Sequence, residues 1–269
     1  MAKISAEKTI RALVKSNVDT YATTFSARHI RELDNPKGTI NMKIHNVFIE
    51  ALGKETRYYT ALVRSLDSSL GNMLERLGIN IAELFYEVHR RVEGSLGVEQ
   101  TQQIAELLEE YKRNVRKPSV SDYQSLRNKP TGNSLLNKRH ESDYYLKDPN
   151  TKAHYLIELK IGGDLDNKKA RSEKEAILEQ FAILSNTLPK NRTIKIFFAT
   201  AYNRYGEGKP WNQSRVKQFF ADDELLIGKD FWNFICKSKK GYDIVLDEYR
   251  KNAFLIKNAL ASIKEVYLG

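Results

Sequence analysis

The stretch SDYYLKDPNTKAHYLIELKI, residues 142–161, decides the fold of this chain. Its first end contains two tyrosines and a leucine, and its second end a tyrosine, two leucines and two isoleucines. The run DPNTK (residues 148–152) between them has the residues that tight turns favour. The stretch therefore predicts two antiparallel strands joined by a turn. A turn centred on this run places Asp143 of the first strand opposite Glu158 of the second.

Alternation along the second strand separates its side chains into two sets. Successive side chains of a strand point to opposite faces of the sheet, so Glu158 and Lys160 share one face. Asp143 is expected to join them there from the neighbouring strand. The other set is apolar and is expected to face the core: Tyr155, Ile157, Leu159 and Ile161.

Asp143, Glu158 and Lys160 together suggest a hydrolytic chemistry. Two close carboxylates repel each other in a half-buried site, and a shared divalent cation with a preference for oxygen ligands, such as Mg²⁺, relieves that repulsion. Phosphodiester hydrolysis needs an activated water and positive charge on the reacting phosphate, which such a cation and a lysine can supply. The pattern is typical of a metal-dependent nuclease. The alternative is an exposed sheet face on which Glu158 and Lys160 are solvated neighbours.

The rest of the chain surrounds this hairpin with helices. Apolar residues recur at helical spacing from residue 1 to about 115, where no strand is evident, and a loop with Pro118, Pro130 and Gly132 follows between residues 113 and 140. After the hairpin we expect a helix, a buried strand IKIFFAT and further C-terminal helices; the ranges are 172–185, 194–200 and, for the last long helix, 242–267.

The order of these residues and elements resembles a known nuclease signature. Ser142-Asp143 followed by Glu158-Leu159-Lys160, with a helix and a strand after them, resembles the PD-(D/E)XK nuclease motif, except that Ser142 stands at the proline position. The resemblance implies an α/β (α+β) core in which helices flank a mixed central sheet. We expect a single endonuclease domain over 1–269, divided into a helical part, 1–115, and a catalytic core with C-terminal helices, 116–269.

A second resemblance extends over most of residues 40–240. RSLDSSLGNMLERLG (residues 64–78) and RVKQFFADDELLIGKDFWNFI (residues 215–235) are similar to the TdeIII-like group of Type II restriction endonucleases, which reads the palindrome GGNCC. This resemblance implies a homodimer that cuts both strands of double-stranded DNA with Mg²⁺. It also makes Glu75 a candidate fourth catalytic residue, because several such enzymes aim a helical glutamate of the N-terminal half at the metal. A solvated helix-face glutamate is the alternative.

The charge balance favours a polyanionic partner. The chain has 44 Lys and Arg against 34 Asp and Glu, a formal net charge of +10. Basic groups just before and after the hairpin are expected to hold DNA phosphates, and Arg204 and Arg215 could read guanine edges. The alternative for each is a solvated loop charge. The candidate DNA-binding residues are Lys138, Arg139, Lys168, Lys169, Arg171, Asn203, Arg204, Arg215 and Lys217.

Other features narrow the class of protein. The single cysteine, Cys236, cannot form an internal disulfide, so we expect a reducing, cytoplasmic compartment. No run of residues is long and apolar enough to span a membrane. Two alternative functions remain open: a PD-(D/E)XK nuclease with a repair or structure-specific role, and a DNA-binding protein without catalysis.

Overall fold

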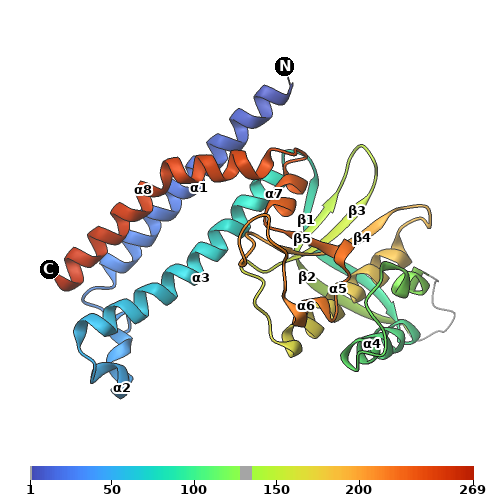
Figure 1. The fold of residues 1–269 in the computed structure, drawn as a ribbon, viewed down its shortest axis with the longest axis horizontal. Coiled ribbons are helices and arrows are strands. Elements are labelled where there is room, and N and C mark those ends of the chain that lie inside the picture. The colour runs from blue at the N-terminus through green and yellow to red at the C-terminus, as the bar shows by residue number, and fades with distance from the viewer. Residues whose placement is uncertain (1, 128–134) are drawn as a thin grey trace. The chain divides into compact units, whose positions relative to one another are not determined.

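Figure 1 shows the computed structural model, which describes residues 2–127 and 135–269, with side chains from residue 6 onward. The chain divides into two compact units, Met1–Asn80 with Asp243–Gly269 (unit 1) and Ile81–Tyr242 (unit 2). The single endonuclease domain expected over 1–269 stays a prediction. Pro130 and Gly132 of the predicted loop lie outside the described residues.

Unit 1 is helical, as the sequence predicts for its N-terminal part. Its long helices run alongside one another in Figure 1. The apolar stripe of the first helix is buried, with Val14 and Val18 fully covered, and the Tyr267 hydroxyl donates a 2.9 Å hydrogen bond to the His29 carbonyl. The elements are α1 (Ala2–Arg31), η1 (Asn41–His45), α2 (Val47–Glu50), α3 (Lys54–Ala82) and α8 (Gly241–Leu268).

Unit 2 is built on a five-stranded mixed sheet with the order β1-β2-β3-β4-β5. The pairs β1/β2 and β2/β3 are antiparallel, whereas β3/β4 and β4/β5 are parallel. This arrangement confirms the predicted α/β class with a mixed central sheet. The strands are β1 (Glu87–Gly97), β2 (Leu135–Lys147), β3 (His154–Leu159), β4 (Ile194–Thr200) and β5 (Leu225–Ile227).

Helices cover both faces of the sheet. On one face, Phe181 of α5 (Asn167–Thr187) belongs to a core with Leu156 of β3 and Phe198 of β4. On the other, Phe231 of α7 (Lys229–Ile235) packs against Tyr144, with ring centroids 5.7 Å apart. The remaining helices of unit 2 are α4 (Val98–Lys112), η2 (Val120–Arg127), α6 (Ser214–Lys217) and η3 (Asp222–Glu224).

Helices on both faces of the sheet correct the expectation that only one face of β3 packs against a core. The set with Tyr155 and Ile157 does pack inward, but Leu156, which shares the face of Glu158, belongs to the core beneath α5. Glu158 is itself only 9% exposed. The face of Leu156, Glu158 and Lys160, which was expected to lie opposite the core, is therefore itself packed against a core, and the polar site occupies one end of it.

Three local predictions were wrong. Residues 87–97 form strand β1 rather than a helix, because pairing with β2 along almost the whole of β1 satisfies its backbone groups. The predicted loop between residues 113 and 140 contains η2 and the first part of β2. The C-terminal segment contains the short strand β5 beside β4. Among the described residues, no helix has the length and apolar character required to cross a bilayer.

Candidate active site

A bulge in β2 positions Asp143. Between the pairs His89↔Tyr145 and Arg91↔Glu141, β2 advances four residues while β1 advances two. The extra residues lie around Asp143, where the regular ladder between the two strands is interrupted. Bulges of this kind bend a strand and redirect a side chain, often beside an active site.

The hairpin of β2 and β3 has the predicted register. Tyr144 pairs with Ile157 and Tyr145 with Leu156, so the next step along the ladder brings Asp143 to Glu158. The Asp143 carboxylate accepts a 2.9 Å hydrogen bond from the Leu159 backbone N–H. This bond holds Asp143 at the carboxyl end of β3.

Lys160 follows directly after β3 and contacts two carboxylates. Its ammonium forms a short hydrogen bond and ion pair with Glu158, and it lies 3.1 Å from the carboxylate of Glu173. The Lys160 backbone N–H donates to the Ala199 carbonyl at 2.9 Å, which continues the pairing with β4. The strand end and the helix α5 thus bring Glu158, Lys160 and Glu173 together.

Glu173 was not anticipated, although the sequence contains a signal for it. It lies four residues before Ile177, a member of the apolar stripe that predicts α5. Residues four apart share one face of a helix, so the carboxylate of Glu173 lies on the same face of α5 as the apolar stripe. Its side chain is 24% exposed.

The electrostatics of the site favour a cation. Burial, followed by the nearby charge of Asp143, raises the pKa of Glu158 to about 8. Burial alone would lower the pKa of Lys160, but the carboxylates of Glu158 and Glu173 outweigh it and the pKa is raised. Lys160 is therefore charged, and it partly compensates a cluster with more carboxylates than cations.

The donor set suits a hard divalent cation. Asp143 and Glu158 present carboxylate oxygens at one end of β3, and Mg²⁺ is commonly held by one or two carboxylates together with water and substrate phosphate oxygens. In residues 2–127 and 135–269, no group of three or more His, Cys, Asp or Glu side chains is placed to bind a metal ion. Two protein carboxylates, completed by water and DNA, are consistent with both observations.

Five of the DNA-binding candidates lie on two elements, Lys138 and Arg139 on β2 and Lys168, Lys169 and Arg171 on α5. Lys138 is 2.6 Å from Glu179, and Arg139 is 3.6 Å from Glu141. The other three are on the first turns of α5: Lys168 and Lys169, which are exposed, and Arg171, which is 3.9 Å from Glu175.

The remaining four candidates, Asn203, Arg204, Arg215 and Lys217, lie on the loop after β4 and on α6. Asn203 is buried and its side-chain amide bonds its own loop, donating to the Lys209 carbonyl at 2.7 Å. Arg204 pairs with Asp164 at 2.8 Å. Arg215 and Lys217 are exposed on α6. A DNA contact stays a prediction for each of the nine candidates.

Glu75 lies on α3, in unit 1, at a partly buried position. Asp143, Glu158 and Lys160 lie together in unit 2. The role of Glu75 in catalysis therefore stays a prediction.

One comparison identifies the family of the chain. The family model described as "Type II restriction endonuclease, HinfI" matches residues 6–253. Neither the curated proteins nor the solved structures give a match. The TdeIII-like grouping and the GGNCC site stay predictions. The family match spans most of the sequence, so the chain belongs to the HinfI family of Type II restriction endonucleases, hydrolases that cleave DNA at specific sites.

Proposed function

We propose that the protein is a Mg²⁺-dependent endonuclease of the PD-(D/E)XK type that hydrolyses both strands of a short palindromic DNA site. The observation that supports this most directly is the convergence of Asp143, Glu158 and Lys160 at the carboxyl end of β3. Asp143 and Glu158 would hold Mg²⁺, which when bound lowers the pKa of a water and neutralises charge on the phosphate.

The residues of the chain have separate tasks in this proposal. Lys160 orients the attacking water and places its ammonium beside the charge that develops on the scissile phosphate. Glu173 limits where that ammonium can go, because its carboxylate lies 3.1 Å from the ammonium. The Leu159 N–H fixes the carboxylate of Asp143. The leaving 3′ oxygen of the DNA takes its proton from solvent or a bound water.

The recognition sequence is proposed from the TdeIII-like resemblance as GGNCC. Purified protein incubated with phage DNA and Mg²⁺ should give discrete fragments, and sequencing of the fragment ends should give one palindrome and one cut position. Ends at GGNCC would support the subgroup. Discrete ends at another palindrome would contradict only the GGNCC site, whereas a smear without preferred ends would favour a repair or structure-specific nuclease.

A DNA-binding protein without catalysis is the alternative from a different class. It predicts that Mg²⁺ changes the affinity for DNA and leaves the DNA intact. Retained plasmid supercoiling after prolonged incubation with Mg²⁺ would support this alternative. A cytoplasmic location remains part of the proposal, on the single buried cysteine, Cys236.

We also propose that the enzyme is a homodimer, because a two-fold palindrome is matched by two identical subunits that each read one half-site. Unit 1 offers a surface for the second copy: Val47, Phe48 and Leu52 are 68, 83 and 67% exposed. Such clustered apolar exposure is typical of interfaces. Sedimentation of the protein, free and bound to its cut site, should give a dimer.

Phe48→Glu tests that surface. Placing a charge at the centre of an apolar contact is expected to weaken the dimer by at least about tenfold, about 1.4 kcal/mol. Val115→Glu is a matched control, because Val115 is 74% exposed but lies in unit 2. Equal dimerisation of both variants would exclude the Phe48 surface, and a monomer in wild-type protein on DNA would exclude the homodimer itself.

A further inference from the structure

A basic pocket of about 840 Å³ lies in unit 2, beside the first residue of α5. It lies between the segment that follows α4 and the segment around α6. The charged residues that line it are Arg116, Lys117, Arg215, Lys217 and Asp222. Four cations thus surround one carboxylate.

Two of these cations already have partners. Arg116 contacts Glu110 at 2.8 Å and Asp122 at 3.3 Å, and Lys217 contacts Asp222 at 2.9 Å. By contrast, no carboxylate in the described ranges lies within ion-pair distance of Lys117 or Arg215. The pocket therefore has an excess of positive charge that its own side chains leave available for an anion.

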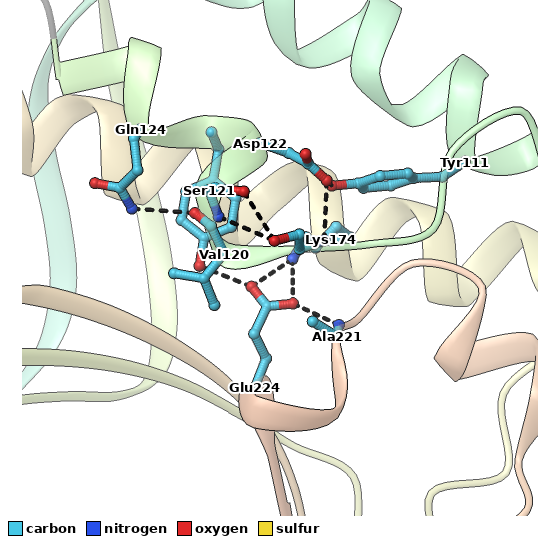
Figure 2. Close-up of polar contacts among 10 residues, drawn as sticks. Tyr111, Val120, Ser121, Asp122, Gln124, Lys174, Ala221 and Glu224 are labelled. Atoms are coloured by element: carbon cyan, nitrogen blue, oxygen red, sulfur yellow. Dashed lines mark hydrogen bonds and ion pairs between the residues drawn. The ribbon is translucent and has the colours of Figure 1, made fainter.

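One wall of the pocket is held by a buried ion pair (Figure 2). Lys174 of α5 and Glu224 of η3 are 0 and 1% exposed, and the ammonium lies 2.7 Å from both carboxylate oxygens. Glu224 also accepts a 2.8 Å hydrogen bond from the backbone N–H of Ala221, a residue that lines the pocket. The Lys174 ammonium lies 4.7 Å from the ring centroid of Phe220, another lining residue.

The opposite wall is held by Asp122. Its carboxylate accepts hydrogen bonds from the Tyr111 hydroxyl at 2.8 Å and from the Ser119 backbone N–H at 2.9 Å, and it contacts Arg116 (Figure 2 shows Asp122 and Tyr111). A buried ion pair adds little net stability compared with apolar residues. Here the pair and Asp122 fix two segments that are distant in sequence, so the cations of the pocket are held in place before any ligand arrives.

We propose that this pocket binds backbone phosphates of duplex DNA beside the scissile phosphate. The inference rests on the proposed active site, because α5 links the two places: Asn167 lines the pocket and Glu173 contacts Lys160. Six residues of α-helix rise about 9 Å, less than three base-pair steps of duplex DNA at about 3.4 Å each. One bound duplex can therefore reach both. Lys117 and Arg215 are the phosphate ligands, and Arg215 contributes affinity rather than base recognition.

The test measures binding of wild type, Lys117→Ala and Arg215→Ala to two duplexes without Mg²⁺, one with the cut site and one without. Each substitution should weaken binding to both duplexes by a similar factor and lower the slope of log affinity against log salt by about 0.9, the value for one lost phosphate contact. Lys240→Ala is the matched control, because Lys240 is an exposed lysine of unit 2 outside the pocket. It should leave affinity and slope unchanged.

Three outcomes would overturn the proposal. The first is an unchanged salt slope in both pocket variants, and the second is a loss of affinity confined to the duplex with the cut site, which would mean base recognition. The third is displacement of DNA by millimolar inorganic phosphate at constant ionic strength, which would mean a site for free anions. All three are measured from DNA binding, without cleavage. If the salt slopes of the pocket variants fall while wild-type protein does not cut DNA with Mg²⁺, the phosphate-binding role of the pocket is supported and the proposed nuclease activity is wrong.

Discussion

Glu158→Ala is expected to abolish DNA cleavage in Mg²⁺, with a loss of at least about a thousandfold, or about 4 kcal/mol in the activation barrier. The reason is that Glu158 and Asp143 are the two proposed carboxylate ligands at the carboxyl end of β3, and loss of either leaves the proposed cation with one protein ligand. Asp143→Ala should have the same effect. Both variants should still bind duplex DNA, because each removes a negative charge near the phosphates.

Glu141→Ala is the control for both substitutions. Glu141 lies on β2 only two residues from Asp143, but its side chain is 68% exposed and pairs with Arg91. Cleavage by this variant should stay close to wild type, as measured by the rate of plasmid linearisation at saturating Mg²⁺. The metal-ligand assignment would be wrong if Asp143→Ala or Glu158→Ala kept more than about a tenth of the wild-type rate, because a lost ligand of the catalytic metal costs far more than that.

The parts of unit 2 that could be predicted from the sequence are those with local signals. The run DPNTK fixes the turn, and the alternation in residues 154–159 fixes which side chains share a face, so the register that brings Asp143 to Glu158 follows from the sequence. The nearly all-apolar run of β4 identifies a buried strand in the same way.

The parts that could not be predicted depend on contacts between distant segments. β1 contains four charged residues and only two buried apolar ones, Val92 and Leu96, and it is a strand because β2 pairs with it. The contact of Glu173 with Lys160 requires α5 to pack against the end of β3. Lys174 and Glu224 are fifty residues apart, and neither residue alone signals a buried ion pair.

Lys160→Ala is expected to slow cleavage by at least about a hundredfold, about 2.7 kcal/mol, because it removes a preorganised positive group next to the reacting phosphate. The structure also permits a weaker interpretation, since Lys160 forms ion pairs with Glu158 and Glu173 that could serve stability alone. The two interpretations differ in size, because a partly exposed ion pair contributes about 1 kcal/mol or less.

A single-turnover assay at saturating enzyme and Mg²⁺ distinguishes the catalytic interpretation of Lys160 from the stabilising one. Lys160→Ala should keep its fold and near wild-type affinity for the cut site while the rate of the chemical step falls, and Lys160→Arg should restore little, because a planar guanidinium cannot replace a compact ammonium directed at one water. Lys195→Ala, on an exposed position of β4, is the control for loss of a lysine from the same sheet. A decrease smaller than about fivefold in Lys160→Ala, about 1 kcal/mol, would assign Lys160 to the ion pairs and leave the activation of water to the metal alone.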